Sequence, residues 1–335
     1  MNNMKKNRKK KLSVLLAGLL LTAAFVSGCG KKAENTDGLT EVNMAFCTFT
    51  GYSPMFIAQE QGYFEDAGIH MNIQVIEDES TYASLITKGD IQFLATAQDP
   101  NIKMYANGAA SRYVLTMDES YGADALVATE GINSLDDLKG KSVALDKSAS
   151  SYYFFLKALE DGSSLSEDDI DVQDMGDTTE AGVAFMGGQV DAAIMWEPEL
   201  SNALAEVAGA HTIVTSADYP DAISDSLVVN ADYATEHPEV VDAVKEAWYK
   251  AVEFYQAHAT EAYENMASGF EEVTPEDIES DAAGLRFLGK EDNEKLLDAN
   301  ADGNIYDLCK EMAYFWMSKG ECKTDELDDY FSLVK

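Results

Sequence analysis

Arginine is scarce in this sequence of 335 residues, and cations of any kind are few. Lys and Arg total 24 against 60 Asp and Glu, which gives a formal net charge of −36 at pH 7. Beyond residue 28 the only arginines are Arg112 and Arg286. Because a surface this acidic repels phosphate backbones and anionic headgroups, the composition argues against a nucleic-acid partner.

Histidine is also rare, and the motifs of common enzyme classes are missing. The 4 histidines are scattered through the chain. No nucleophile elbow and no phosphate-binding loop is present. The sequence therefore predicts neither an enzyme nor a cofactor.

Only 4 cysteines occur, and three of them follow Cys29. Three is an odd number, so disulfides cannot pair them all. Cys309 and Cys322 are 13 positions apart. They could form a disulfide or remain buried thiols, and the sequence leaves both open.

Long apolar runs are limited to one, at residues 12–26, which follow a basic segment at residues 5–11. Fifteen residues are too few for a comfortable membrane span, and the pattern is that of a secretory signal. The run closes with Val26-Ser27-Gly28-Cys29, which resembles the lipobox of bacterial lipoproteins. We therefore expect a signal peptide over residues 1–28, a lipid on Cys29, a polar tether over residues 29–40, and a protein anchored outside the cell membrane. An ordinary secreted protein is the alternative.

The body of the chain alternates between strand and helix patterns. Strands are expected at residues 41–46, 71–76, 91–95, 142–145, 170–175, 192–196 and 227–230. Helices are expected at residues 54–61, 80–87, 152–159, 180–187, 237–257, 260–267, 275–288 and 304–317. Such alternation predicts an α/β fold with parallel strands. Two such modules followed by a helical tail indicate two lobes with a ligand between them.

Several short motifs occur in a characteristic order. They are Gly51-Tyr52-Ser53-Pro54, Gly89-Asp90, Gly122-Ala123-Asp124, Leu138-Lys139-Gly140-Lys141, Gly188-Gln189-Val190-Asp191, Trp196-Glu197-Pro198 and Asp225-Ser226-Leu227. From about residue 41 to about residue 255 the chain thus resembles the substrate-binding proteins of ABC importers, in the group for nitrate, sulfonates, taurine and thiamine precursors.

This resemblance implies a type II periplasmic-binding-protein fold, in which two lobes close over a ligand by a hinge motion. Lobe 1 would comprise residues 41–128 and 225–335, and lobe 2 residues 129–224. The implied partners are a small-molecule ligand and the permease subunits of the importer, with the binding protein itself a monomer.

Candidate ligand-binding residues follow from where strands end. A helix that starts directly after a strand points backbone N–H groups into the crevice at the strand's carboxyl end. In lobe 1 this consideration selects Thr50, Gly51, Tyr52, Ser53, Gln98 and Asp99. In lobe 2 it selects Ser148, Ser150 and Ser151, together with Trp196 and Glu197 at the end of a strand. Asp225, at the second crossover, could reach the ligand or fix the hinge.

The lobe 2 serine segment departs from the pattern of relatives. They often carry a glycine and a serine, then a histidine, at the positions of Ser148, Ala149 and Tyr152. That difference indicates a different ligand. Capping of a helix is the alternative role for the three serines.

The scarcity of arginine and the candidate carboxylates restrict which class of ligand is expected. Neither Arg112 nor Arg286 falls on a predicted cleft loop, so a bidentate arginine fork on an anion is not expected. Asp99, Glu197 and Asp225 offer acceptors for a cation. A zwitterion such as taurine fits, as does an aminopyrimidine thiamine precursor stacked on an aromatic ring, whereas nitrate fits worst. A sensing ectodomain without transport would share all of these residues.

Residues 298–305 resemble the first half of a calcium loop. The twelfth position is Cys309 rather than glutamate, so the bidentate ligand of such loops is missing. A turn between two helices is the expected structure, and we predict no metal site.

Overall fold

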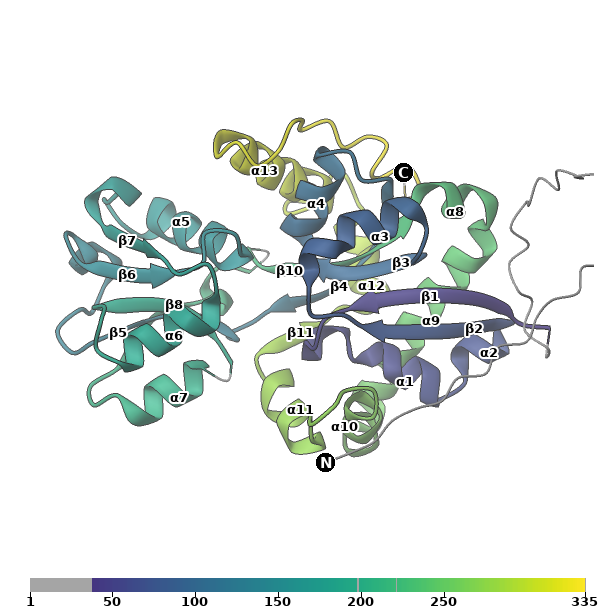
Figure 1. Ribbon diagram of the computed structural model, residues 1–335, viewed down its shortest axis with the longest axis horizontal. Helices are drawn as coiled ribbons and strands as arrows, with labels where there is room; N and C mark the ends of the chain where they lie inside the picture. The colour runs from purple at the N-terminus through teal and green to yellow at the C-terminus, as the bar shows by residue number, and fades with distance from the viewer. Residues whose placement is uncertain (1–37, 198, 221, 335) are drawn as a thin grey trace, which may run out of the picture. The chain divides into compact units, whose positions relative to one another are not determined.

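A computed structural model describes residues 38–197, 199–220 and 222–334 (Figure 1). The first of its two sheets has six strands. In sheet order they are β11 (Leu285–Phe287), β4 (Ser111–Ser120), β10 (Ser224–Asn230), β3 (Phe93–Ala97), β1 (Thr40–Phe46) and β2 (Ile69–Val75). The predicted signal peptide, Cys29 and most of the predicted tether lie outside the described residues.

The first sheet is mixed rather than parallel throughout. β1 pairs parallel with β2 and β3, whereas β10 lies antiparallel between β3 and β4. The helices that follow β1, β2 and β3 are α1 (Pro54–Glu60), α2 (Tyr63–Asp66), α3 (Tyr82–Lys88) and α4 (Gln98–Ala106). A short 3₁₀ helix, η1 (Thr50–Tyr52), precedes α1. The carboxyl ends of β1 and β3 therefore meet at one edge of the sheet, as predicted.

The second sheet has five strands. In sheet order they are β7 (Asp171–Asp174), β6 (Ser142–Leu145), β8 (Ala192–Trp196), β5 (Asp124–Ala128) and β9 (His211–Thr215). Its helices are α5 (Ser150–Gly162), α6 (Thr178–Met186) and α7 (Glu199–Glu206). All seven strands expected from the sequence are present across the two sheets.

The predicted division of the chain differs from sheet membership at one strand. Residues 124–128 were assigned to lobe 1, yet they form β5, which pairs antiparallel with β8 and β9 of the second sheet. Only three residues separate β4 from β5, and Gly122 among them has φ 107°, a value that favours glycine. Because the turn is this short, the change of sheet comes before residue 124 rather than after 128.

The two connections between the sheets are bonded to each other. Ser120 Oγ lies 2.7 Å from Ser216 Oγ and donates to Asp124 Oδ2 at 2.7 Å. Ser216 Oγ also accepts from the backbone N–H of Gly122 at 2.8 Å. These contacts join the β4–β5 connection to the β9–β10 connection, close to the predicted second crossover.

The C-terminal part is mostly helical, as expected. Its helices are α8 (Ala231–Glu236), α9 (Pro238–Ala257), α10 (Ala259–Ala267), α11 (Pro275–Ala282), α12 (Lys290–Leu296) and α13 (Ile305–Ser318). The prediction of one helix over residues 275–288 was wrong, because α11 ends at Ala282 and residues 285–287 form β11 against β4. Gly284 allows the close approach that this pairing needs, since a Cβ there would lie 2.9 Å from Ala123 Cα.

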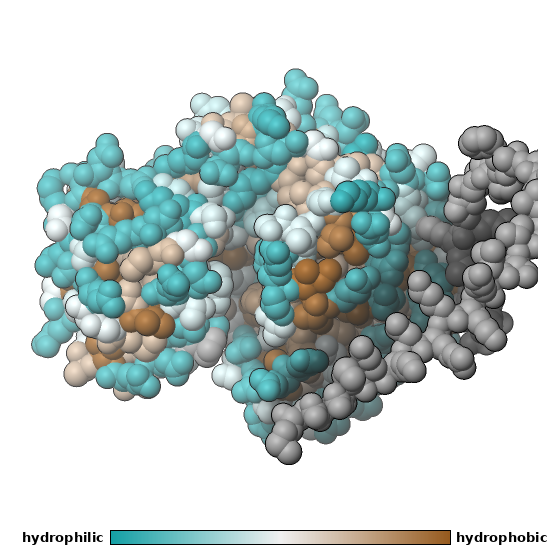
Figure 2. All heavy atoms as spheres, viewed as in Figure 1, coloured by the Kyte–Doolittle hydropathy of each residue, from teal (hydrophilic) through white to brown (hydrophobic). Residues whose placement is uncertain are grey.

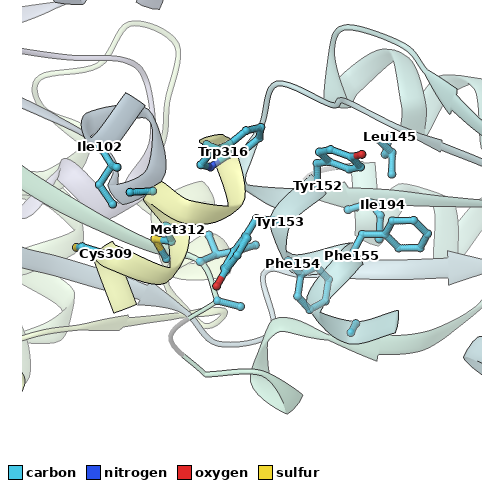
Figure 3. Packing of buried hydrophobic residues seen from close by; sticks show 14 of the residues in the cluster. Ile102, Leu145, Tyr152, Tyr153, Phe154, Phe155, Ile194, Cys309, Met312 and Trp316 are labelled. Atoms are coloured by element: carbon cyan, nitrogen blue, oxygen red, sulfur yellow. The ribbon is translucent and has the colours of Figure 1, made fainter. Parts of the chain in front are cut away.

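Buried apolar side chains link α13 to α4 and α5. Figure 3 shows Met312 and Trp316 of α13 between Ile102 of α4 and the aromatic side chains of α5. The ring centroids of Tyr153 and Phe315 are 5.0 Å apart. The C-terminal helix is therefore part of a core shared with elements of both sheets.

Cys309 and Cys322 do not form the disulfide that the sequence left open. Cys309 and Cys322 are both free thiols, and Cys309 is fully buried in the α13 core.

Residues 298–304 form a turn between α12 and α13, and Asn304 caps α13 by accepting from the backbone N–H of Asp307 at 3.1 Å. No helix among the described residues is long and apolar enough to cross a membrane.

Candidate functional site

A cavity of about 660 Å³ lies where elements of the two sheets meet. On one side it is lined by the segment after β1, by η1 and by β10. On the other it is lined by the segment after β6, by the first turns of α5 and α6, and by the end of β8. This volume suits a small molecule. The face in Figure 2 is mostly hydrophilic, with apolar side chains in small separate patches.

Eight acidic residues line this cavity. The acidic residues are Glu77, Glu79, Asp124, Asp146, Asp177, Glu197, Asp225 and Asp281. No Lys or Arg is among the described residues that line it. A partly enclosed site lined by one sign of charge concentrates counter-ions, so this cavity attracts a cation.

Three of these carboxyls are held in place by hydroxyl donors and lose solvation. Asp225 is 4% exposed and accepts from the Tyr52 hydroxyl, while burial raises the pKa of Asp225 to about 7. Burial likewise raises the pKa of Asp124 to about 6. Thr50 Oγ1 donates to Asp281 at 2.9 Å, and burial raises the pKa of Asp281. Desolvated carboxyls of this kind gain most from a cation placed beside them.

Two hydroxyls at the opposite side of the lining have no bonding partner. Ser151 lies in the first turn of α5, and Thr178 is the first residue of α6. Both side chains are buried, at 1% and 3% exposed, and neither hydroxyl has a hydrogen-bond partner within the described part of the chain. Hydroxyls at helix N-termini can donate to an anionic or acceptor group of a ligand.

Aromatic rings complete the lining. Phe49, Tyr52, Trp196 and Phe270 contribute to it, and the Phe49 and Tyr52 ring centroids are 5.1 Å apart. Trp196 is 38% exposed at the end of β8. These rings provide apolar walls between the carboxylates.

Comparison with known proteins identifies relatives of this chain. Residues 50–262 match the family model described as NMT1/THI5 like. The chain belongs to the NMT1/THI5-like family. It is 30% identical over 261 residues to a putative aliphatic sulfonates-binding protein of Bacillus subtilis, covering 76% of each chain. It is 23% identical over 219 residues to the taurine-binding periplasmic protein of Escherichia coli, covering 65% of this chain and 68% of the other.

Solved structures confirm the fold expected for an NMT1/THI5-like protein. The periplasmic aliphatic sulphonate binding protein SsuA of Escherichia coli superposes with a TM-score of 0.71 at 18% identity, over 87% of this chain and 91% of that one. The alkanesulfonate-binding protein SsuA of Xanthomonas axonopodis bound to MOPS gives 0.64 at 18% identity, over 88% and 96%. The relatives found by sequence are named as binding proteins, which agrees with the prediction that the chain is not an enzyme.

The structure brings eight of the twelve predicted site residues to the cavity of this NMT1/THI5-like protein. They are Thr50, Tyr52, Ser148, Ser150, Ser151, Trp196, Glu197 and Asp225. The other four, Gly51, Ser53, Gln98 and Asp99, lie behind the lining and are buried. The cavity lining thus depends on fewer strand-end residues than the sequence suggests.

The residues around η1 use their donors within the protein. The expectation that their N–H groups point to a ligand differs from the structure, because the N–H of Tyr52 donates to Phe49 O and that of Ser53 to Thr50 O. Ser53 Oγ also donates to Thr50 O, at 2.6 Å. These N–H groups are bonded within the 3₁₀ turn. The segment therefore lines the cavity with side chains rather than with free backbone donors.

Gln98 and Asp99 do not end β3 but begin α4. Gln98 Nε2 donates to the Tyr330 hydroxyl at 3.2 Å, and Asp99 accepts from the Ser150 hydroxyl. The helix begins directly after the last residue of β3, which directs both side chains behind the cavity. Asp99 therefore positions Ser150 rather than facing a ligand.

The three serines before and in α5 play different roles. Ser148 donates to Asp146 through both its backbone N–H and its hydroxyl, at 2.8 and 2.7 Å. The Ser150 hydroxyl donates to Asp99. Only Ser151 keeps an unpartnered hydroxyl, which makes it the strongest donor candidate of the three.

Glu197 lines the cavity but already has partners. Its carboxylate accepts from the backbone N–H of Ser201 at 3.1 Å and from the Ser201 hydroxyl at 2.9 Å. These bonds satisfy donors in the first turn of α7. Glu197 therefore has a capping role in addition to any contact with a ligand.

Several polar lining residues were not predicted from the sequence. Among them are Glu79, Asp124, Asp177, Thr178 and Asp281. The stretch Asp177-Thr178-Thr179-Glu180 after a strand is a helix start, and Asp177 indeed accepts from the Glu180 N–H at 3.1 Å, so this pair could have been found. Asp281 lies within a predicted helix, and nothing local indicated that it faces Thr50.

Gly51 supports the site through close packing. A Cβ at this position would lie 2.3 Å from Phe49 Cε1 and 2.5 Å from Asp118 Oδ2. We expect Gly51→Ala to lower the free energy of unfolding by about 1–3 kcal/mol, because the added methyl displaces two neighbours. Urea unfolding followed by circular dichroism measures this change. Gly289→Ala is the control, since a Cβ there would meet only ordinary contacts, and an equal effect of both changes would contradict the packing argument.

Proposed function

We propose that this protein is an extracytoplasmic solute-binding protein of an ABC importer that captures a small zwitterion carrying an amine, such as taurine. The observation that carries the proposal is the cavity whose described lining holds eight acidic residues and no Lys or Arg. The relative named for taurine binding supports this class of ligand, and the relative named for aliphatic sulfonates supports its sulfonate end. A lipid on Cys29, outside the described residues, would hold the protein at the membrane beside its permease.

The two sides of the cavity suit the two ends of a zwitterion. The ammonium would lie at the Asp225 side, where desolvated carboxyls accept its hydrogen bonds. The sulfonate would lie at Ser151 and Thr178, whose free hydroxyls sit at helix N-termini. No arginine fork is needed, because hydroxyls and helix ends supply the donors.

The cationic end should govern affinity. Eight acidic groups raise the cost of bringing a lone anion into the cavity, whereas an ammonium neutralises part of that charge. An alkanesulfonate without an amine therefore lacks the group that the lining favours most. This distinguishes the expected ligand from those of relatives named for alkanesulfonates.

A second candidate is an aminopyrimidine of the thiamine-precursor class. The rings of Phe49, Tyr52 and Phe270 offer apolar faces for stacking, and the neighbouring carboxylates can accept from an exocyclic amine. A sensing ectodomain would bind through the same cavity, so this alternative concerns the partner and not the ligand.

Isothermal titration calorimetry on the soluble chain from Gly30 onward tests the ligand, since that chain keeps every described residue. Taurine, ethylamine and ethanesulfonate form a matched set, because each of the latter two lacks one end of taurine; a hydroxymethyl-aminopyrimidine is the fourth probe. We expect taurine to bind most tightly, ethylamine weakly and ethanesulfonate not at all. Binding of the pyrimidine alone would select the second candidate, and binding of ethanesulfonate as tightly as taurine would contradict the role of the carboxylates.

A further inference from the structure

Two buried carboxyls are neighbours on adjacent strands, one lining the cavity and one beside it. Asp118 on β4 and Asp225 on β10 are paired residues in the antiparallel register of the first sheet. Asp118 is 0% exposed and Asp225 is 4% exposed. Asp225 lines the cavity, whereas Asp118 lies on the neighbouring strand β4 and does not line it.

The hydrogen bonds around this pair are incomplete. Asp225 Oδ1 accepts from the Tyr52 hydroxyl. Neither oxygen of Asp118 has a hydrogen-bond partner within the described part of the chain. Leaving two adjacent buried carboxylates ionised would cost desolvation twice and add their repulsion. A single proton removes both costs, because a carboxylic acid O–H on one residue can donate to the carboxylate of the other.

The groups around the pair do not supply a compensating positive charge. The titratable groups near it in the described chain are Cys47, Tyr52, Glu79, Glu119 and Asp124. Glu119 is itself bound by Arg286, whose Nε donates to Glu119 Oε2 at 3.0 Å. Burial raises the pKa of Tyr52, so that this residue remains a hydroxyl donor at neutral pH. The neighbouring carboxylates therefore add negative potential at the pair.

The pKa values agree with this geometry. Burial, and next the negative charge of Asp225, raise the pKa of Asp118 well above its ordinary value. Burial raises that of Asp225 to about 7. Two such neighbours titrate as a unit, and the pair holds the proton below about pH 7.

We infer that Asp118 and Asp225 share one proton in the ligand-free protein, and that a ligand ammonium at Asp225 displaces this proton to solvent. The ligand part of this inference rests on the proposed function. The charge balances, because one ammonium enters as one proton leaves and no other bond is broken. Asp118 is thus a positioning residue that makes capture of the cation dependent on pH.

The linkage sets the direction of the pH effect. Below pH 7 the ligand must displace a proton that is held, so its apparent affinity should fall by up to about tenfold for each pH unit. Above pH 7 the proton is already lost from the free protein, and affinity should level off. A neutral ligand would show no such dependence.

A ligand-free experiment tests the shared proton itself. A carboxyl with a raised pKa stabilises the fold at low pH, and this contribution is lost as pH rises through about 7. Asp118→Asn replaces the pair with an amide that donates to Asp225, so the variant should not lose this stability. We expect the melting temperature of the variant, relative to wild type, to rise between pH 5.5 and pH 8. A difference that stays constant over this range would overturn the inference.

Infrared difference spectra between the same two pH values give a second readout. They are recorded on Asp124→Asn, because the buried Asp124 also titrates near pH 6 and would contribute the same band. They should show loss of a buried protonated-carboxyl band. If Asp118→Asn fails to fold, this band decides the question, and its absence would overturn the inference.

Calorimetry with taurine at pH 6.5, in two buffers of different ionisation enthalpy, tests the exchange. We expect about one proton released per taurine bound by the wild type, and almost none by Asp118→Asn. The exposed Asp168→Asn is the matched control and should release protons like the wild type. Taurine binding without proton release would overturn the inference alone. Absence of binding by taurine and ethylamine would reject the proposed function, and the ligand-free experiments would then decide whether the proton is shared.

Discussion

Replacing Asp225 with Asn should weaken taurine binding about 30- to 150-fold. Asp225 is the lining carboxyl on β10, 4% exposed and oriented by the Tyr52 hydroxyl. Asn keeps the size of the side chain but removes the charge, so the ligand loses a charged hydrogen bond of about 2–3 kcal/mol. Titration calorimetry of both proteins at pH 8, where the shared proton is absent, measures the change.

The same substitution should leave the fold intact. The Asn side chain can donate to Asp118 and still accept from Tyr52, so the melting temperature at pH 8 should be equal to or above that of the wild type. Asp168→Asn, on an exposed turn, is the control for removing one negative charge anywhere on the chain. Unchanged taurine affinity in Asp225→Asn, with the wild-type fold, would remove Asp225 from the site.

Replacing Trp316 with Ala should lower the free energy of unfolding by about 3–5 kcal/mol. Trp316 of α13 is 1% exposed and packs against residues of α4 and α5 (Figure 3). The Nζ atom of Lys103 also lies 3.8 Å from the centroid of its ring. Truncation leaves a large cavity in the core that joins α13 to the elements of both sheets, and urea unfolding followed by circular dichroism measures the loss.

Tyr314 provides the matched control on the same helix. It is 70% exposed, so Tyr314→Ala should change the free energy of unfolding by no more than about 0.5 kcal/mol. If Trp316→Ala were as mild as this control, α13 would not be part of the cooperative core described above.

The strands that the sequence predicts correctly have short alternating or apolar patterns next to glycine turns. Residues 142–145 and 192–196 match β6 and β8 in both bounds. The failures lie where pairing partners decide the structure. Residues 285–287 were assigned to the end of a helix, and only their pairing with β4 makes them a strand.

Some residues of the candidate site could be predicted from the sequence and others could not. Serines near the start of a helix that follows a strand could be found, because helix starts have a local signature, and Ser151 indeed lines the cavity. The role of Asp118 could not be found, since it depends on its register opposite Asp225, which is more than a hundred residues away. Likewise, nothing in the sequence showed that Ser201 would occupy the carboxylate of Glu197.

The position of taurine in a crystal structure of the complex tests the central claim most directly, because it shows which end of the ligand meets which side of the cavity. We expect the taurine nitrogen about 3 Å from a carboxylate oxygen of Asp225, and sulfonate oxygens about 3 Å from Ser151 Oγ and Thr178 Oγ1. Taurine bound in the reverse orientation, or outside this cavity, would contradict it.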